Sequence, residues 1–433
     1  MKEDVVIFWF RRDLRLEDNT GLWHALTSGY KVIPVFIFDT EILGKLESDD
    51  ARVSFIFECL KNINRKLKTV GSEVFLLHGT PEDCFKILLS TYSIKAVYIN
   101  RDYEPYAINR DIKIEKILAS NQIPLFSFKD QVIFEKSEIV KDNGKPYTVY
   151  TPYSKRWLKE FKEPFIKEIP SSDLIANFRK QDCKVVTIES MGFSKSIFTV
   201  RRPDLSESSI INYNLTRDIP SAAGTSLVGP HLRFGTMSIR EVMRKTYGVN
   251  LVYTQELIWR EFFMQILFHF PYVEKGSFRP EYDRILWLNN EDSFEKWCAG
   301  KTGFPLVDAG MRELNKTGYM HNRVRMVAAN FLTRHLLTDW RWGEAWFASK
   351  LLDYELSSNN GNWQWSAGTG CDAAPYFRIF NPELQVKKFD PKLIYIKNWV
   401  SEFGTADYPA PIVDHTFART RAIGYYKEGL KPL

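Results

Sequence analysis

Hydrophobic residues in the first 130 positions form short continuous runs rather than alternating with polar residues. Each run is rich in β-branched and aromatic side chains, and stretches with helical spacing separate the runs. Strands that are hydrophobic on both faces are typical of parallel sheets covered by helices on both sides. We therefore predict a doubly wound α/β domain over residues 1–130, with strands in "DVVIFWF", "YKVIPVFIFD", "SEVFLLHG", "IKAVYINRD" and "IPLFSFKD".

From residue 205 onward the pattern changes, because apolar residues recur at spacings of three and four. This spacing predicts helices, for example in "QELIWREFFMQILFHF" and "RVRMVAANFLTRHLL". Between the two halves, turn formers and mixed charges predict a long linker with short helices. The sequence thus predicts an α/β domain, an interdomain linker over 131–204 and an all-helical domain over 205–433.

Doubly wound sheets bind ligands at the carboxyl ends of their strands. Neither a GxGxxG motif nor a P-loop follows the first predicted strand, where Arg11, Arg12, Asp13 and Arg15 stand instead. An ordinary dinucleotide or nucleoside triphosphate site is therefore not expected in this half. The more informative motifs lie in the helical half.

Composition narrows the function only slightly. The chain has 59 Lys and Arg against 53 Asp and Glu, a formal charge of +6 that permits an anionic partner without requiring one. The 12 Trp, 31 Phe and 20 Tyr residues indicate either a large core or a cavity that binds rings.

The cysteines and the N-terminal residues both indicate a cytoplasmic location. The five cysteines form no CxxC pair and only seven histidines accompany them, so neither a disulfide framework nor a metal site is expected. The apolar run near the N-terminus has six residues, too few for a signal peptide or a membrane span. We predict a cytoplasmic protein.

Two predicted helices each gather informative side chains on one face. Residues at i, i+3 and i+4 share a helix face, and two such sets occur in "QELIWREFF" and "HNRVRM". Either set could form a binding face, or only a packed helix edge with a local ion pair. Arg323 lies off the second face, where it could contact a phosphate or solvent. The two sets are Glu256, Trp259 and Arg260, and Asn322, Arg325 and Met326.

Two further stretches combine turn formers with groups that bind cofactors. Segment 225–235 is rich in Ser, Thr and Gly, and its backbone amides could cap a helix or bind phosphate. Asp353 and Glu355 precede "SSNNGNWQW", in which a glycine among amides is typical of a turn. Two carboxylates, several amides and two tryptophans so close together favour a cofactor pocket over ordinary surface charge.

These stretches, in this order, resemble the photolyase and cryptochrome flavoprotein family. The resemblance implies an N-terminal antenna domain and a C-terminal helical domain that binds one FAD, active as FADH−. It also allows a second, antenna chromophore, whose identity the sequence leaves open. Further matching motifs, from Val5 to the "YPAPIVDH" near the C-terminus, are "VVIFWFRRDLRLEDNTGL", "GKTGFPLVDAGMRELNKTGYMHNRVRM" and "GCDAAPYFRIFNPELQVKKFDP".

By position in these motifs, the resemblance assigns several residues to the flavin. Arg325 and Asp353 would pair beside the isoalloxazine ring, and Asn359 would face flavin N5. Tyr253 lies at an aromatic position of the pocket. Glu355 stands where aspartate is usual, so its contact with the ribityl chain or ring edge is less well defined. The flavin phosphates would be held by Tyr213, Thr225, Ser226, Leu227, Val228 and Gly229, the last of which replaces a serine found in many members.

Three tryptophans match the electron-transfer chain of the family. The resemblance places Trp363 next to the flavin, Trp340 in the middle and Trp287 near the surface. Any one of these residues could be an ordinary core residue.

The motif "HNRVRM" favours cyclobutane pyrimidine dimers as the lesion. Relatives that act on (6-4) photoproducts typically carry paired histidines there, whereas this chain has His321 followed by Asn322. The resemblance implies that Glu256 contacts a pyrimidine edge and that Met326 lies between flavin and lesion. The other implied contacts with DNA or the lesion are those of Arg217, Trp259, Arg260, Asn322, Arg323 and Trp365.

The predicted function is therefore an enzyme that splits pyrimidine dimers in UV-damaged DNA, using light. A photoreceptor of the cryptochrome type is the alternative, but such receptors often replace the asparagine at position 359, which this chain retains. A dark electron-transfer flavoprotein would leave Trp259 and Trp365 unexplained. We expect a monomer without an obligate protein partner or membrane contact, associated with the nucleoid in a bacterium. For the antenna, "NRDYEPYAINRD" lacks the asparagine–glutamate pair of folate-binding relatives, which leaves a deazaflavin, a second flavin or none.

Overall fold

The computed structural model describes residues 3–183 and 186–432. The chain divides into two compact units, and it passes between them several times. Unit 1 comprises Met1–Glu138, Leu158–Pro203 and Leu227–Tyr247, and unit 2 comprises Ile139–Trp157, Asp204–Ser226 and Gly248–Leu433. The boundaries near residues 130 and 204 stay predictions.

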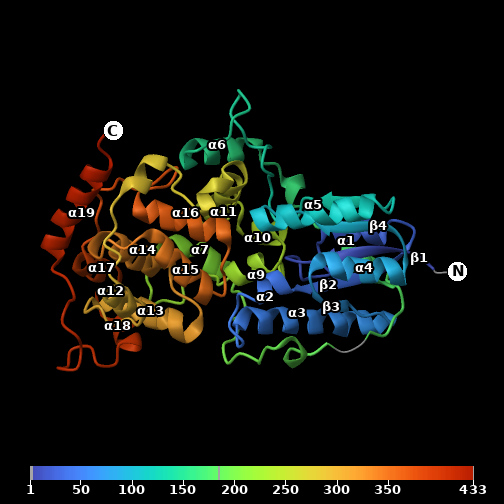
Figure 1. Ribbon diagram of the computed structural model, residues 1–433, viewed down its shortest axis with the longest axis horizontal. Helices are drawn as coiled ribbons and strands as arrows, with labels where there is room; N and C mark the ends of the chain where they lie inside the picture. Colours follow the sequence, from blue (N-terminus) through green and yellow to red (C-terminus); the bar gives the residue numbers. More distant parts are fainter. Residues whose placement is uncertain (1–2, 184–185, 433) are drawn as a thin grey trace. The chain divides into compact units, whose positions relative to one another are not determined.

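Unit 1 is built on a five-stranded parallel sheet with the strand order β3-β2-β1-β4-β5 (Figure 1). In the central strand, Ile7 pairs with Ile33 of β2 and with Val97 of β4. Alternate residues of each strand enter two separate cores, so that α1 and α3 cover one face and α4 and α5 the other. The predicted α/β class is therefore confirmed. The strands are β1 (Asp4–Phe10), β2 (Lys31–Asp39), β3 (Phe75–Gly79), β4 (Ser93–Asn100) and β5 (Leu125–Phe128).

The helices of unit 1 begin where side chains cap their free backbone amides. Asn19 accepts a hydrogen bond from the amide of Leu22 at the start of α1, and Thr80 caps α4 before a proline. The helices are α1 (Thr20–Leu26), α2 (Thr40–Leu43), α3 (Ala51–Leu67), η1 (Lys68–Val70), α4 (Pro81–Thr91), α5 (Pro105–Ala119), η2 (Glu163–Ile166), η3 (Ser171–Asn177), η4 (Glu189–Met191), α9 (Gly229–Arg233) and α10 (Ile239–Thr246).

Protein side chains bind one another at the ligand position of an ordinary doubly wound sheet. That position lies between the carboxyl ends of β1 and β4, where the strand order reverses. There the Asn100 amide donates to Asp13 at 2.6 Å, and Arg12 pairs with Asp102 at 3.0 Å. Arg12 and Asp13 stand where a dinucleotide-binding motif would follow β1.

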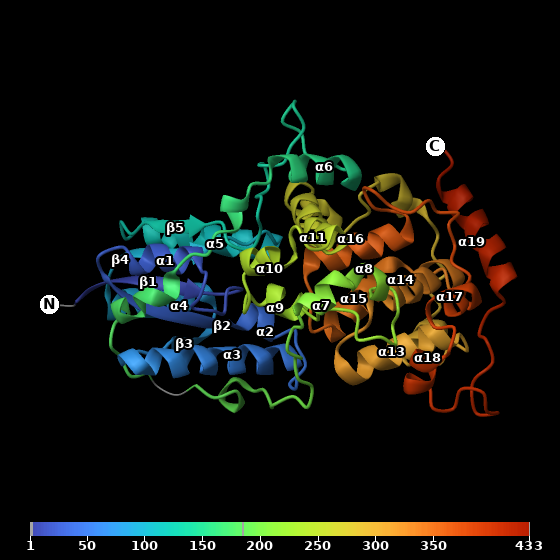
Figure 2. The ribbon, with the colours of Figure 1, turned by 180° about the vertical axis from the view of Figure 1, so that it is seen from behind.

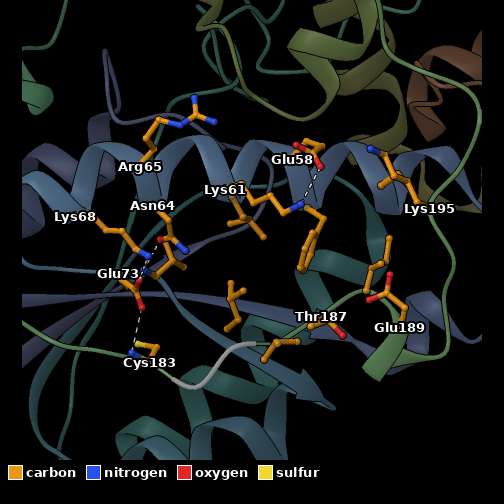
Figure 3. A pocket seen from close by; sticks show the side chains of 17 residues that line it. Glu58, Lys61, Asn64, Arg65, Lys68, Glu73, Cys183, Thr187, Glu189 and Lys195 are labelled. Carbon is orange, nitrogen blue, oxygen red and sulfur yellow. Dashed lines mark hydrogen bonds and ion pairs between the residues drawn. The ribbon is translucent and has the colours of Figure 1, made fainter.

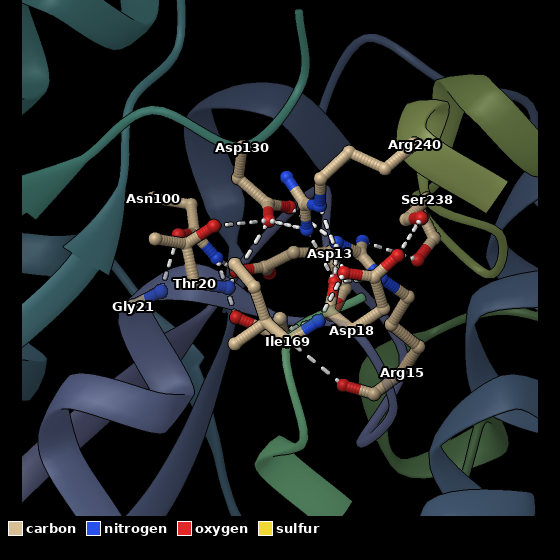
Figure 4. Close-up of polar contacts among 12 residues, drawn as sticks. Asp13, Arg15, Asp18, Thr20, Gly21, Asn100, Asp130, Ile169, Ser238 and Arg240 are labelled. Carbon is tan, nitrogen blue, oxygen red and sulfur yellow. Dashed lines mark hydrogen bonds and ion pairs between the residues drawn. The ribbon is translucent and has the colours of Figure 1, made fainter. Parts of the chain in front are cut away.

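A buried ionic network ties α10 to the edge of the sheet (Figure 4). Asp130, only 1% exposed, accepts from Arg15 at 2.5 Å and from Arg240 at 2.8 Å. Arg240 also binds Asp18 at 2.8 Å, and Ser238 donates to the same carboxylate. Burial opposes ionisation, but the two arginines hold the pKa of Asp130 well below its usual range.

Unit 2 is helical and has one large core formed by α12 to α16 and α18. Within it α16 packs against α11, α14 and α15 (Figure 2). Its helices are most of α6 (Tyr150–Glu160), α7 (Glu207–Ile211), α8 (Tyr213–Thr216), α11 (Leu251–His269), η5 (Pro271–Glu274), η6 (Pro280–Arg284), α12 (Glu291–Cys298), α13 (Pro305–Thr317), α14 (Asn322–Asn330), the π-helix η7 (Phe331–His335), α15 (Trp340–Lys350), α16 (Leu356–Ala367), α17 (Pro382–Phe389), α18 (Ile394–Trp399) and α19 (His415–Gly429).

The amide-rich "NNGNWQW" is the interior of α16 and not a turn. Within this helix Gly361 faces the ring of Phe263, and an added Cβ would be 2.2 Å from its Cδ1 atom, so the packing requires a glycine here. Tertiary packing thus overrides the local turn preference of an Asn-Gly sequence. None of the helices among the described residues combines the length and apolar character needed to cross a bilayer.

The ionic network gives the first prediction. Asp130→Asn keeps the shape of the side chain but leaves Arg15 and Arg240 without their shared carboxylate, which should cost about 3–5 kcal/mol of unfolding free energy. Urea unfolding followed by circular dichroism measures this loss. Because the folded pKa is depressed, the stabilisation is complete above the ordinary aspartate pKa of about 3.9 and disappears as the pH falls below it.

The control for Asp130→Asn is Glu58→Gln, which breaks the exposed pair with Lys61 on α3 and should cost less than about 1 kcal/mol. A similar small loss for Asp130→Asn would contradict the role given to the network.

Candidate functional site

Most of the residues singled out in the sequence line one cavity of about 340 Å³ in unit 2. This volume is within the range of about 300–1,000 Å³ that is usual for small-molecule sites. Helices α11, α14, α15 and α16 and the segment before α16 supply the walls. The predicted residues that line it are Arg217, Glu256, Trp259, Arg260, Asn322, Arg325, Met326, Asp353, Glu355, Asn359, Trp363 and Trp365.

The amide of Asn359 has a fixed orientation. Its Nδ2 atom donates to the backbone oxygen of Glu344 at 3.1 Å and to the carboxylate of Glu344 at 2.8 Å. Both partners are acceptors, so the opposite amide orientation would lose both bonds. Among the described residues no donor reaches Oδ1, which leaves this oxygen free to accept a hydrogen bond from a ligand in the cavity.

A second fixed pair lies between α14 and the segment before α16. Arg325 donates to both oxygens of Asp353, at 3.1 and 2.8 Å, and its Nε atom donates to the backbone oxygen of Met320 at 2.7 Å. Burial disfavours the charge, but Asp353 raises the pKa of Arg325 above its usual value. The guanidinium therefore stays charged, and both of its ends are held in place.

The acids on the other walls are also paired with arginines. Glu256 binds Arg217, and Glu355 accepts from Arg260 at 3.2 Å. Burial raises the pKa of Glu256, although Arg217 opposes the shift. Because the Glu256 side chain is still 35% exposed, it can reach a ligand without leaving its partner.

The predicted phosphate contacts lie outside the lining of this cavity. In unit 2, Tyr253 is hydrogen-bonded to Ser226 at 2.6 Å, and its ring lies 4.7 Å from that of Tyr213. Thr225 is within 3.3 Å of the hydroxyl of Tyr319. Leu227 has a left-handed backbone (φ 54°), and the predicted residues Leu227, Val228 and Gly229 belong to unit 1.

Two further predicted residues have protein partners. Arg323 binds Asp218 at 2.7 Å and lies over the ring of Phe389, so a phosphate would have to compete with that carboxylate. Trp340 is buried at the start of α15, with Arg341 over its ring.

The remaining two tryptophans differ in burial. Trp363 is 2% exposed and lies next to Phe347, with ring centroids 5.0 Å apart, and next to Trp297 at 6.2 Å. Trp287 is partly buried and meets Tyr426 edge to face at 5.8 Å. The electron-transfer order of Trp363, Trp340 and Trp287 stays a prediction.

Several residues of this region carry no clear signal in the sequence. Glu344 orients Asn359 from 15 positions away, and Tyr319 reaches Thr225 across the unit. Tyr150, at the start of α6, stacks on Trp259. Only a helical reading of "NNGNWQW" would have placed Asn359 and Trp363, at i and i+4, on one face.

A larger cavity of about 560 Å³ lies in unit 1, between α3 and side chains of Cys183 and of segment 186–195 (Figure 3). Its exposed walls are mostly apolar, and four of its charged side chains are paired, Lys61 with Glu58 at 3.0 Å and Lys68 with Glu73 at 2.8 Å. None of the predicted site residues lines it. The predicted site residues that line a cavity are therefore in the smaller one.

Comparisons with known proteins agree with this geometry. Residues 6–171 match the family model described as DNA photolyase, and residues 253–406 match that of the FAD binding domain of DNA photolyase. The deoxyribodipyrimidine photo-lyase of a Synechococcus strain is 34% identical over 98% of this chain and 96% of its own length. That of Escherichia coli is 32% identical over 98% and 99%.

Solved structures show the same relationship. A bacterial class III photolyase from Agrobacterium tumefaciens has a TM-score of 0.86 at 33% identity, covering 100% of this chain and 99% of its own. An archaeal photolyase from Sulfolobus tokodaii, solved with two FAD molecules, has a TM-score of 0.85 at 34% identity, covering 98% and 100%. The Synechocystis cryptochrome, with a TM-score of 0.84 at 24% identity and covering 98% and 99%, shares the fold.

The α/β unit, the helical unit and its cavity define a flavin-binding enzyme of DNA repair. The chain belongs to the DNA photolyase family. The predicted fold class, light-dependent repair as an activity, and FAD as the cofactor are thereby confirmed. The donor set also fits a flavin, since the cavity offers a fixed amide oxygen, a held guanidinium and aromatic walls.

The packing of Trp363 gives a second prediction. A Cβ atom on Gly343 would lie 2.1 Å from Cη2 of Trp363. Gly343→Ala should therefore displace the ring, lower the unfolding free energy by about 1–3 kcal/mol and slow photoreduction of the bound flavin. Thermal melting and flavin absorbance under illumination measure both effects.

Gly424→Ala, in helix α19 with open space around the glycine, is the matched control and should be neutral or slightly stabilising. If Gly343→Ala behaves like Gly424→Ala, the close fit between Gly343 and Trp363 has no functional role.

Proposed function

We propose that this chain splits cyclobutane pyrimidine dimers in UV-damaged DNA and that the cavity of unit 2 holds the flavin ring and the dimer together. One observation carries the proposal. The acceptor Asn359, the acid Glu256 and the rings of Trp259 and Trp365 all line the same cavity.

For the flavin we propose two groups of contacts. The free Oδ1 of Asn359 would accept a hydrogen bond from flavin N5, and Arg325 with Asp353 would lie beside the ring. Tyr213, Tyr253, Thr225 and Ser226 are our candidates for contacts with the rest of the cofactor. The roles of Leu227, Val228 and Gly229 at the phosphates stay predictions from the family motif.

A reduced FAD held beside Asn359 and Arg325 would supply, on excitation by light, the one electron needed to break the two cyclobutane carbon–carbon bonds, and would recover it afterwards. The protein keeps this cycle free of net redox change by excluding other reaction partners and by holding polar groups in place. The fixed Asn359 amide is neutral, so extra negative charge nearby costs less than it would beside a carboxylate.

The dimer must leave the duplex to reach such a cavity. Extrusion costs a few kcal/mol and is cheapest for a damaged, poorly stacked base pair, which favours lesions over intact sites. Trp259 and Trp365 would stack against the extruded bases, at about 1–3 kcal/mol for each base. Met326 would fill the space between the flavin and the bases.

Glu256 would hold the pyrimidine edge. As a carboxylate it accepts from an N3–H group, and when protonated it can also donate to a carbonyl. Burial raises its pKa while Arg217 opposes the shift, and the ion pair with Arg217 keeps the side chain in position. Arg260, Arg323 and Asn322 are our candidates for further DNA contacts.

Three finer predictions accompany this function. We propose that the protein acts as a monomer without an obligate partner and that it is cytoplasmic. The third concerns an antenna chromophore, for which a second flavin is the alternative supported by the Sulfolobus relative with two FAD molecules.

The lesion class is tested with two oligonucleotides, one bearing a cyclobutane dimer and one a (6-4) photoproduct. The purified flavoprotein, chemically reduced, is illuminated with blue or near-ultraviolet light, and the products are separated by chromatography. We expect repair of the cyclobutane dimer and none of the (6-4) photoproduct. Repair of only the (6-4) photoproduct, or of neither, would refute the proposal.

The role of Glu256 is tested by Glu256→Ala. Loss of one hydrogen bond to a charged group, about 1.5 kcal/mol, should lower repair at limiting DNA about tenfold while the flavin stays bound. The exposed Glu295→Ala on α12 serves as the matched control and should leave repair unchanged. Wild-type repair by Glu256→Ala would remove Glu256 from the site.

A further inference from the structure

Three aromatic rings pack against the ring of Trp259. The ring of Tyr150 lies parallel to it, with centroids 3.5 Å apart and planes at 6°. Phe262 meets Trp259 nearly at right angles, at 5.5 Å, and Phe263 lies at 5.4 Å with its plane tilted by 29°. Trp259 also lines the cavity, so part of its side chain is open to a ligand.

Tyr150 is itself held at three points. Its backbone amide donates to the carboxylate of Asp372 at 2.9 Å, which caps the first turn of α6. Its hydroxyl donates to the backbone oxygen of Gln255, also at 2.9 Å. The side chain is 9% exposed, and its ring packs against Phe262 as well as Trp259.

The bond to Gln255 acts on Trp259 directly. In an α-helix the carbonyl of Gln255 is the acceptor for the backbone N–H of residue 259. Tyr150 therefore binds the same carbonyl that anchors the Trp259 backbone, and its ring restricts the Trp259 side chain. Gln255 also precedes Glu256, so this hydrogen bond supports both residues of the proposed lesion contact.

We propose that Tyr150 is a positioning residue that holds the ring plane of Trp259 for stacking with the extruded pyrimidine. The proposal rests on the function proposed above. A base stacks well only on a ring whose plane is set in advance, because ordering a free side chain on binding costs about 0.5–1.5 kcal/mol and offsets much of the stacking energy. Tyr150 would contact Trp259 and not the substrate.

The test compares two changes at one position. Tyr150→Leu removes the ring, whereas Tyr150→Phe keeps the ring and loses the hydroxyl that donates to Gln255. Tyr153→Leu is the matched control, since Tyr153 is on the same helix, is 2% exposed, and has ring contacts with Tyr147 and Phe262. The dissociation constants for dimer-bearing and undamaged oligonucleotides and the flavin absorbance are measured for each full-length protein.

We expect Tyr150→Leu to weaken binding of the dimer-bearing oligonucleotide roughly tenfold, with undamaged DNA and bound flavin unchanged. Tyr150→Phe should bind the dimer within about twofold of wild type, and Tyr153→Leu should keep wild-type preference for damaged DNA even if its melting temperature falls. If the Tyr150 ring served only folding, its removal would lower the affinities for dimer-bearing and undamaged DNA alike, or would change neither.

Three results would overturn the proposal. The first is that Tyr150→Leu keeps the wild-type preference for damaged over undamaged DNA, whether both affinities fall or neither does. The second is that Tyr153→Leu shows the same selective loss of dimer affinity. If Tyr150→Leu does not retain flavin, Tyr150→Met is measured in its place. The third result is that neither variant retains flavin, which would make Tyr150 a folding residue. Failure of the wild-type protein to bind or repair the dimer would instead refute the proposed function.

Discussion

The close approach of α16 to α11 and α15 is the constraint on which the cavity depends. Two glycines permit it, since a Cβ on Gly361 would be 2.2 Å from Phe263 and a Cβ on Gly343 would be 2.1 Å from Trp363. With these helices in contact, Asn359 reaches Glu344 on α15. The close packing of these helix backbones therefore determines the walls of the cavity and the positions of its polar groups.

The interior of α16 shows how one short sequence serves several neighbours. Asn360 and Gln364, at i and i+4, both donate to the backbone oxygen of Val273 and so tie the helix to η5. Asn359 and Trp363, also at i and i+4, line the cavity instead. Asn362 donates to the Ser358 carbonyl within the helix. The amides that look unpaired in the sequence are thus mostly partners of backbone groups, which explains why costly tryptophans can lie beside them.

How far the sequence predicts this molecule depends on the range of each interaction. Continuous apolar runs predict the sheet because a strand that is buried on both faces needs apolar residues at consecutive positions. The set Glu256, Trp259 and Arg260 is predictable because helix spacing alone brings it together. Contacts such as Glu344 with Asn359, or Tyr150 with Trp259, depend on how helices pack, and no local pattern encodes them. The same cause makes "NNGNWQW" helical against its turn preference.

The action spectrum of dimer splitting tests most directly whether a photoexcited flavin acts on the lesion in this cavity. The protein with reduced flavin and a cyclobutane-dimer oligonucleotide is illuminated at a series of wavelengths, with a matched sample in the dark, and repaired DNA is measured per photon absorbed. We predict no repair in the dark and a wavelength dependence that follows the absorbance of the bound chromophores. Equal repair in the dark, or no repair at any wavelength absorbed by a flavin that stays bound, would contradict the central claim that this cavity brings a photoexcited flavin and the extruded lesion together.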